Sequence, residues 1–259
     1  MCLLLVAHDA HPAYRLIVAA NRDEYHARPS LPADRWQDSP GILGGRDLES
    51  SGTWLAIHES GRFAAVTNVR TGHVVGSGAR SRGLIVTDFL YENASAPAFT
   101  ASLASKALDY NGFNLLAHDG TYLTWYSNQA DEPHTLDAGI YTLSNAQLDT
   151  RWPKTEWLRT GFDSVMNDHD GDPVPGLLDL LRKAERASDD VLPDTGVGRD
   201  MESVLSAIFI EGSRYGTRCS TVVTIDRGNH IRFCERRFDS SGHCTGDSWF
   251  AFELGDAAL

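Results

Sequence analysis

Two apolar segments separated by a short turn open the chain, and this pattern constrains the fold more than any other. Residues 3–8 (LLLVAH) and 15–20 (RLIVAA) flank a turn that contains Pro12. Apolar stretches of strand length joined by so tight a connection predict a β-hairpin. In an antiparallel hairpin the end of the second strand lies beside the start of the first. We therefore expect Cys2 and Asp23 to be neighbours in space.

The rest of the chain alternates between groups of strands and groups of helices. Apolar patterns predict further strands at 53–58, 62–68, 113–117, 122–127, 140–144, 217–226, 230–238 and 249–252. They predict helices at 81–93, 97–110, 152–166, 177–187 and 201–209, and loops at 28–40, 72–78 and 188–200. Hairpins dominate and strand–helix–strand alternation is absent, which favours an α+β fold. We expect one domain over residues 1–259, with two antiparallel sheets packed face to face and helices outside.

Charge and cysteine usage exclude several classes of function. The net charge of −12 argues against a nucleic-acid partner, because phosphate contacts need a basic surface. No apolar run is long enough to span a membrane, and no basic segment of a signal peptide precedes the first strand. The cysteines form no Cys-x-x-Cys pair, and His8 and His11 flank a turn without a third ligand, so no metal site is predicted. We expect a cytoplasmic protein with reduced thiols.

Cys2 is the strongest candidate for a catalytic group. Removal of Met1 would make it the N-terminal residue, with a thiol nucleophile and an α-amine base on the same residue. The alternative is that Cys2 only begins a buried strand, because free cysteine is among the most buried residue types.

Four other residues are candidate partners of Cys2. Asp23 would orient and tune the terminal amine; alternatively, it caps a turn. Asn68 and Asn145 each end a predicted strand, from which a side-chain amide can donate to an oxyanion; alternatively, each satisfies its own turn. Arg218 begins a strand and would clamp a carboxylate of the ligand or of Asp23; alternatively, it is a surface residue.

Motifs in the same order along nearly the whole chain resemble those of a known family. They are Met1-Cys2, Ala19-Ala20-Asn21-Arg22-Asp23-Glu24, Gly44-Gly45-Arg46-Asp47-Leu48, Gly52-Thr53-Trp54-Leu55, Thr67-Asn68, Gly112-Phe113-Asn114, Leu143-Ser144-Asn145-Ala146, Trp152-Pro153-Lys154, Asp194-Thr195-Gly196-Val197-Gly198 and Tyr215-Gly216-Thr217-Arg218. The chain resembles the NRDE family, also called the Transport and Golgi organization 2 family.

The resemblance implies a fold and a site. The family is similar to N-terminal-nucleophile (Ntn) hydrolases of the choloylglycine hydrolase and penicillin acylase type, which implies a four-layered αββα sandwich. It implies that the catalytic residues are Cys2, Asp23, Asn68, Asn145 and Arg218. The candidate binding residues are Asn21, Arg22, Glu24 and Arg46. One departure is Ala20, where those acylases have an arginine that supports the thiolate; Arg22 or Arg46 would have to replace it.

Two functions remain open at this stage. The first is hydrolysis of a linear amide or thioester by Cys2, with no cofactor required. The second is non-catalytic binding and trafficking of a small hydrophobic ligand, because family members are implicated in haem trafficking and in lipid or acyl-CoA homeostasis. In that case haem would be a bound cargo.

Overall fold

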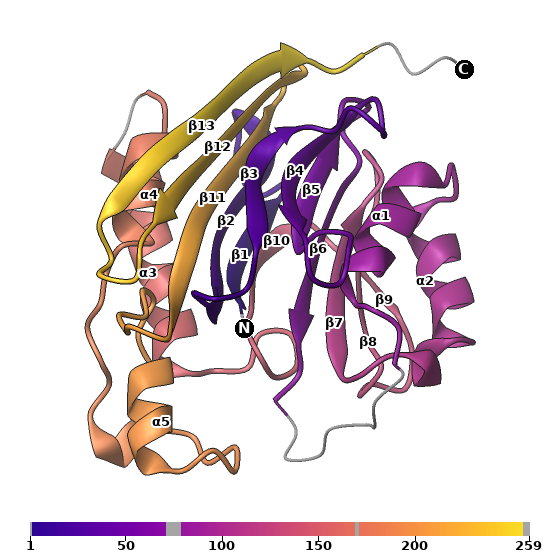
Figure 1. The fold of residues 1–259 in the computed structure, drawn as a ribbon. Coiled ribbons are helices and arrows are strands. Elements are labelled where there is room, and N and C mark those ends of the chain that lie inside the picture. Colours follow the sequence, from indigo (N-terminus) through magenta and orange to yellow (C-terminus); the bar gives the residue numbers. More distant parts are fainter. Residues whose placement is uncertain (1, 71–78, 169–170, 256–259) are drawn as a thin grey trace.

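A computed structural model describes residues 2–70, 79–168 and 171–255 of the chain. Within these residues, sheet A contains six antiparallel strands in the order β10-β1-β2-β11-β12-β13. The strands are β1 (Cys2–His8), β2 (Tyr14–Tyr25), β10 (Gly139–Leu143), β11 (Tyr215–Asp226), β12 (His230–Phe238) and β13 (Cys244–Glu253). The pair β2 and β11 forms the long centre of the sheet (Figure 1).

Sheet B is an antiparallel meander of seven strands among the described residues, in the order β3-β4-β5-β6-β7-β8-β9. The strands are β3 (Ser30–Arg35), β4 (Ile42–Asp47), β5 (Leu55–His58), β6 (Phe63–Asn68), β7 (Phe113–His118), β8 (Leu123–Ser127) and β9 (His134–Leu136). Neighbours in this sheet are also successive strands in the sequence, although the connection between β6 and β7 contains α-helices.

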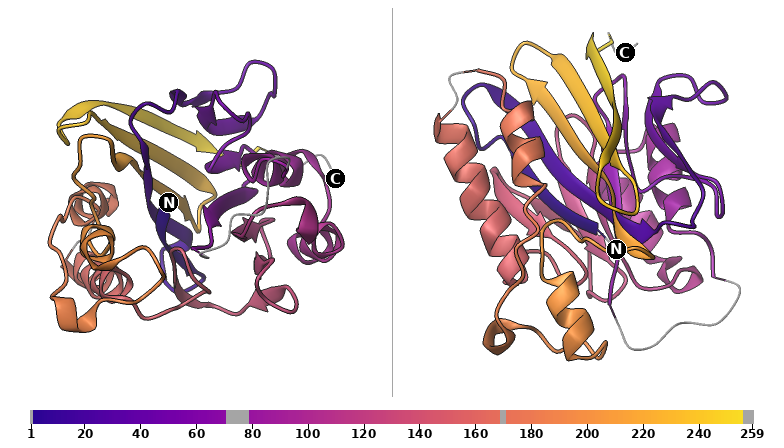
Figure 2. Two further views of the ribbon diagram at one scale, coloured as in Figure 1. Left: turned by 60° about the horizontal axis from the view of Figure 1, so that its bottom comes forward. Right: turned by 60° about the vertical axis from the view of Figure 1, so that its left-hand side comes forward.

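The α-helices of the described residues are α1 (Gly83–Tyr91), α2 (Ala96–Ala104), α3 (Pro153–Asp168), α4 (Val174–Leu180) and α5 (Arg199–Leu205). Helices α1 to α4 cover the outer faces of the two sheets, and α5 lies beyond one end of the sandwich (Figure 1). Helices α1 and α2 pack on sheet B, whereas α3 and α4 pack on sheet A (Figures 1 and 2). The α+β fold and the four-layered αββα sandwich predicted from the sequence are therefore confirmed.

Strand β1 shows why the sheets pack in this way. All of its residues are buried, and successive side chains point to opposite faces. Leu4 and Val6 belong to the core between the sheets, while Leu3 and Leu5 belong to the core beneath α3 and α4. A strand that is apolar on both faces can be stable only in the middle of such a sandwich.

The first hairpin forms as predicted. β1 pairs with β2 with Cys2 opposite Arg22 and His8 opposite Leu16. The Asp9 amide donates to the Arg15 carbonyl at 2.8 Å and closes the turn. The first residues of β1 therefore lie beside the last residues of β2, at the end of the sandwich from which α5 extends (Figure 1).

The prediction that residues 28–40 form a loop is wrong for part of this segment. The segment contains β3, the edge strand of sheet B. Pro32 argues against a strand, because proline is not compatible with a central strand. It is tolerated in β3 because edge strands and bulges leave its position without a ladder hydrogen bond. The pairing of β3 with β4 shifts register between Leu31 and Asp34, on either side of that proline.

Most other predicted elements are present with shifted bounds. Helices α4 and α5 are shorter than predicted, and β4 and β9 were not predicted at all. Helix α3 begins at Pro153, where the missing amide hydrogen costs little. The predicted loop at 72–78 lies outside the described residues. No helix in the described part of the chain is long and apolar enough to cross a membrane.

Candidate active site

The ends of β1, β2 and β11 bring Cys2 and Asp23 to one place, as the hairpin predicted. Both residues are buried, with 8% of Cys2 and 1% of Asp23 exposed. Cys2 pairs with Arg22 across the hairpin, so Asp23 is the next residue along the partner strand. Both side chains line a cavity of about 550 Å³ at this end of the sandwich.

Asp23 is held by β11, the strand on its other side. Thr217 lies opposite it in the ladder, and the Thr217 hydroxyl donates to Asp23 Oδ1 at 2.7 Å. The Tyr215 hydroxyl donates to the Asp23 carbonyl at 3.1 Å. Burial raises the pKa of the Asp23 carboxyl, while Lys154 and the Thr217 hydrogen bond oppose that rise. The carboxyl is thus fixed in position and electrostatically coupled to a buried cation.

The environment of Cys2 keeps its thiol protonated in the absence of a base. Burial raises the pKa of this thiol, and the nearby Asp23 carboxylate raises it further. The Arg22 guanidinium acts in the opposite direction. Because the thiolate is the nucleophilic form, a nucleophile at this position needs a proton acceptor close to the sulfur.

Lys154 is a site residue to which no pattern of residue types in the sequence points. It lies in the first turn of α3 with only 2% of its surface exposed. Burial lowers its pKa to about 8, whereas the charges of Asp23 and Cys2 favour its protonated form. Its ammonium also lies 5.6 Å from the centre of the Trp152 ring. A lysine after Trp-Pro in the sequence gives no sign that tertiary packing will bury it; only the family motif contained it.

Asn68 and Asn145 meet at the edge of the same cavity. The Asn145 side-chain nitrogen donates to the carbonyl oxygen and to the Oδ1 atom of Asn68, each at 3.0 Å. No hydrogen bond to another described residue engages the Asn68 amide nitrogen, and Asn68 lines the cavity. The pair therefore divides its roles: Asn68 faces the cavity, and Asn145 fixes the orientation of Asn68.

A buried ion pair supports the two asparagines and was also missed. Arg70 Nη1 donates to Glu202 Oε2 at 2.9 Å, and their side chains are 6% and 2% exposed. The Arg70 amide donates to the Asn145 carbonyl at 2.7 Å. Glu202 Oε1 accepts from the Thr195 amide at 2.7 Å. The loop before α5 is thus connected to the asparagine pair through charged side chains.

Four arginines and three carboxylates line the cavity. Its basic lining residues are Arg22, Arg28, Arg80 and Arg82, and its acidic ones are Asp23, Glu24 and Asp47. Arg22 lies over the Trp54 ring at 4.2 Å and contacts Asp47 at 3.4 Å. The pKa of the Arg82 guanidinium is lowered by burial, while a Cys2 thiolate would favour its charged form. Arg22 and Arg82 are therefore the lining guanidiniums whose charge acts on the Cys2 thiol.

Three predicted site residues lie elsewhere or have other partners. Arg218 donates to the carbonyls of Tyr25 and Arg28, at 2.9 and 3.1 Å, so its described contacts hold the turn after β2. Asn21 donates to the Leu181 and Ile208 carbonyls and accepts from Ser220, which ties β2 to the helical layer. Arg46 bonds Asp38 and lies over Trp36, outside the Cys2 cavity.

Glu24 does line the cavity, and its carboxylate accepts from the Tyr25 amide at 2.8 Å. No group of three or more His, Cys, Asp or Glu side chains suited to a metal ion is found among the described residues.

Comparison with known proteins identifies the family. The family described as "Transport and Golgi organisation 2" matches residues 1–240. The chain belongs to this family. The human Transport and Golgi organization protein 2 homolog is 35% identical over 257 residues, covering 91% of this chain and 92% of the human protein. The Drosophila melanogaster Transport and Golgi organization protein 2 is 30% identical over 263 residues, covering 91% of each.

The Transport and Golgi organization 2 chain also has similar solved structures. A conjugated bile acid hydrolase from Clostridium perfringens, a mutant form, matches with a TM-score of 0.44 and 11% identity, covering 98% of this chain and 92% of that protein. An ortholog of N-acylethanolamine-hydrolyzing acid amidase from Caenorhabditis elegans matches with a TM-score of 0.42 and 11% identity, covering 70% and 85% respectively.

Proposed function

We propose that this protein is an N-terminal cysteine hydrolase that cleaves a linear amide or thioester. The observation that carries the proposal is the meeting of Cys2, Asp23 and Asn68 in one cavity of about 550 Å³. A nucleophile, a carboxylate that orients its base and an amide donor for an oxyanion are the groups that acyl transfer needs. Removal of Met1 is part of the proposal, because it frees the Cys2 α-amine.

In the first step the Cys2 sulfur attacks the substrate carbonyl carbon, and the α-amine takes the thiol proton. The carbonyl oxygen becomes an oxyanion, to which the Asn68 amide donates. The bond to the leaving amine or thiol then breaks, and the α-ammonium returns the proton to that group. Asp23, held by Thr217 at 2.7 Å, stabilises the ammonium during this step.

In the second step water attacks the thioester that joins the acyl group to Cys2. The α-amine accepts a proton from the water, and Asn68 again donates to the oxyanion. The bond between carbon and sulfur then breaks, the α-ammonium returns the proton to the sulfur, and a carboxylic acid leaves. In both steps the Lys154 ammonium favours the charged forms of the Asp23 carboxylate and the Cys2 thiolate, with which it interacts electrostatically.

Arginines around the cavity support a substrate with an anionic group. Arg80 and Arg82 both line it, and the Arg82 head also donates to the Gly112 carbonyl at 3.0 Å. Guanidinium groups bind carboxylates and phosphates well. We propose that the substrate carries such a group near its scissile bond. The cysteines of the chain are free, which supports a reducing compartment such as the cytoplasm.

The test is hydrolysis of a panel of linear amides and thioesters with and without a terminal carboxylate. Cys2→Ser and Asp23→Ala should each lower turnover by about a thousandfold or more while the protein stays folded. Cys244→Ser is the matched control, because Cys244 is exposed and does not line the cavity. Equal turnover by Cys2→Ser and the parent protein would refute the proposal.

A second candidate function is non-catalytic binding of a small hydrophobic cargo, such as haem or an acyl lipid. The observation that favours it is the raised pKa of the Cys2 thiol, which burial keeps in its unreactive form. Binding of haem or a fluorescent acyl ligand that survives Cys2→Ala, without turnover of any substrate in the panel, would support this function. Failure of all such ligands to raise the melting temperature would remove it.

A further inference from the structure

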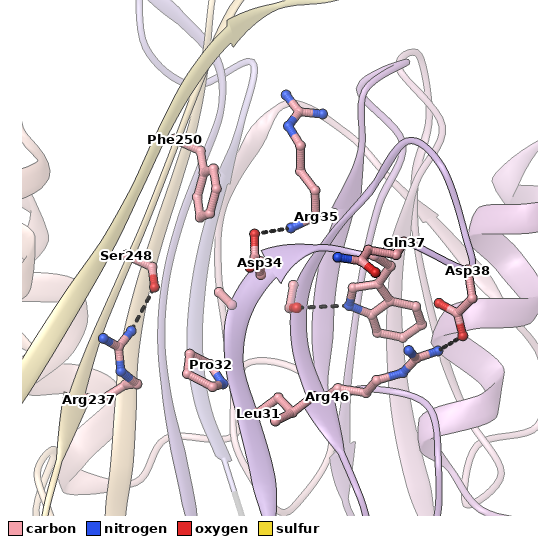
Figure 3. Close-up of a pocket in the computed structure, with 13 residues that line it drawn as sticks. Leu31, Pro32, Asp34, Arg35, Gln37, Asp38, Arg46, Arg237, Ser248 and Phe250 are labelled. Atoms are coloured by element: carbon pink, nitrogen blue, oxygen red, sulfur yellow. Dashed lines mark hydrogen bonds and ion pairs between the residues drawn. The ribbon is translucent and has the colours of Figure 1, made fainter.

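A second cavity, of about 690 Å³, lies on the side of the sandwich where β3 of sheet B approaches β12 and β13 of sheet A (Figure 3). Residues of these strands, of β4 and of the turn after β3 line it, and none of them lines the Cys2 cavity. Its volume is in the range of sites that hold a small organic molecule.

The bulge in β3 lies at this cavity, and its residues from Leu31 to Asp34 line it. Pro32 has no amide hydrogen, and the ladder with β4 shifts register between Leu31 and Asp34. The Ala33 amide instead donates to Glu235 Oε1 on β12 at 2.8 Å. A buried carboxylate of sheet A thus holds this edge strand of sheet B at the point where its ladder with β4 is interrupted.

One wall of the cavity is apolar. Leu31 and Pro32 on β3 and Phe250 on β13 line it, and Leu31 is 49% exposed. Phe250 packs against the core, with its ring 6.4 Å from that of Phe233. In Figure 3, Pro32 and Leu31 lie between the Arg237–Ser248 pair on one side and the Arg46–Asp38 pair on the other. The cavity therefore offers a fixed apolar surface with a guanidinium on either side of it.

The two guanidiniums differ in how they are neutralised. Arg46 Nη2 bonds Asp38 at 2.7 Å. Arg237 Nη1 instead donates to the neutral Ser248 hydroxyl at 2.7 Å, and its nearest described carboxylate oxygen, on Glu235, lies 3.9 Å away. That carboxylate is occupied by the Ala33 amide, and burial raises its pKa. Of these two, Arg237, 26% exposed, is therefore the better placed to bind an anion.

The two acidic side chains that line the cavity, Asp34 and Asp38, have partners other than Arg237. Asp34 turns its Oδ1 to the Arg35 amide at 2.7 Å, and Arg35 itself contacts Glu59 at 3.6 Å. In Figure 3, Asp34 lies toward Phe250, at the opposite end from Arg237. A ligand with its charge at Arg237 and its apolar part on Pro32 would avoid placing two anions together.

We propose that this cavity binds an amphipathic monocarboxylate, with its carboxylate on Arg237 and Ser248 and its ring or short alkyl body against Pro32, Leu31 and Phe250. A guanidinium with a neighbouring hydroxyl can hold a carboxylate through charge-assisted hydrogen bonds. The apolar body gains from leaving water on a surface that is already fixed by the core. This site is independent of the chemistry proposed at Cys2.

The test compares 2-naphthoate with its neutral analogue 2-naphthamide by isothermal titration calorimetry on the full chain. We expect 2-naphthoate to bind at least about tenfold more tightly than 2-naphthamide, because a hydrogen bond between a guanidinium and a carboxylate is stronger than one to a neutral amide. Arg237→Gln should remove this preference, and Arg237→Lys should reduce it. Arg236→Gln is the matched control: the neighbouring Arg236 pairs with Asp247 at 2.9 Å and does not line the cavity.

Melting temperatures of the variants establish that each is folded before titration, and Arg237→Lys keeps the test valid if Arg237→Gln does not fold. The proposal is overturned if 2-naphthamide binds as tightly as 2-naphthoate. It is equally overturned if Arg236→Gln weakens binding as much as Arg237→Lys, or if neither compound binds saturably at millimolar concentrations.

Discussion

Asn145 holds Asn68 by two hydrogen bonds of 3.0 Å, one to its carbonyl oxygen and one to its side-chain oxygen. Asn68 ends β6 in sheet B, and Asn145 follows β10 in sheet A. The pair therefore joins the two sheets at the mouth of the Cys2 cavity. The amide nitrogen of Asn68 is thereby directed by a residue 77 positions away in the sequence. The geometry of an oxyanion donor thus depends on how the two sheets pack.

We predict that Asn145→Asp destabilises the protein and removes turnover together. The carboxylate cannot donate, so the two Asn68 oxygens lose their partner, and we expect a loss of about 1–3 kcal/mol in the free energy of unfolding. Urea unfolding measures this loss. Asn93→Asp is the control, because Asn93 is exposed, and it should change stability by less than about 0.5 kcal/mol. Equal stability of the two variants would contradict this view of the pair.

Removing Glu202 should be costly, because it leaves Arg70 as a buried cation without its carboxylate. We expect Glu202→Ala to lower the free energy of unfolding by about 3–5 kcal/mol, the usual cost of breaking a buried ion pair. Chemical denaturation of this variant and of Glu156→Ala, on the exposed face of α3, makes the comparison. A loss no greater than that of Glu156→Ala would show that the ion pair does not support the site.

Stability should fall in acid because of a buried histidine. His118 is 3% exposed, its ring lies 5.4 Å from that of His8, and burial lowers its pKa to about 4. Between that value and about 6.5 the unfolded chain binds a proton that the folded chain does not, so stability decreases as pH falls through this window. The largest contribution is about 3 kcal/mol.

His118→Gln should flatten the dependence of unfolding free energy on pH between 4 and 6.5, whereas His243→Gln at an exposed site should leave it unchanged. Denaturant titrations at several pH values make this measurement. A parent protein whose stability is constant over that window would contradict the assignment.

Lys154 offers a test of electrostatics within the site. Its positive charge favours the Cys2 thiolate, so Lys154→Met should raise the pKa of the thiol and slow its alkylation several-fold near pH 7.5. Iodoacetamide labelling followed over pH measures the shift. Lys183→Met removes an exposed lysine and should leave the profile in place. If the dependence of alkylation rate on pH is unchanged in Lys154→Met, Lys154 does not influence the Cys2 thiol.

The sequence predicted those features that depend on local pattern. Two apolar segments joined by a short turn predicted the hairpin that brings Cys2 to Asp23. The order of strands and helices predicted the layers. It did not predict Lys154 or Glu202, because a charged residue on a short helix becomes a site residue only through contacts with distant segments. β3 was missed because its proline is compatible with an edge strand but reads as a loop signal.

Arg218 and Asn21 show the limit of motif reasoning. Both belong to conspicuous motifs, yet the described contacts of Arg218 are backbone carbonyls, and those of Asn21 lie in the interior beside α4. A shared motif shows which residues a family retains. It does not show whether a residue supports the fold or takes part in the chemistry. Side-chain direction along a strand decides between them, and a bulge such as that between Thr217 and Cys219 changes this direction.

The most direct test of the central claim is intact-mass and peptide mass spectrometry of the purified protein after brief exposure to iodoacetamide at neutral pH. Exposed Cys244 provides the internal reference thiol, and Cys2→Ala provides the control. The account predicts that Met1 is absent and that Cys2 is labelled faster than Cys244, since its own α-amine accepts the thiol proton. Retention of Met1, or labelling of Cys244 while Cys2 stays unmodified, would contradict it.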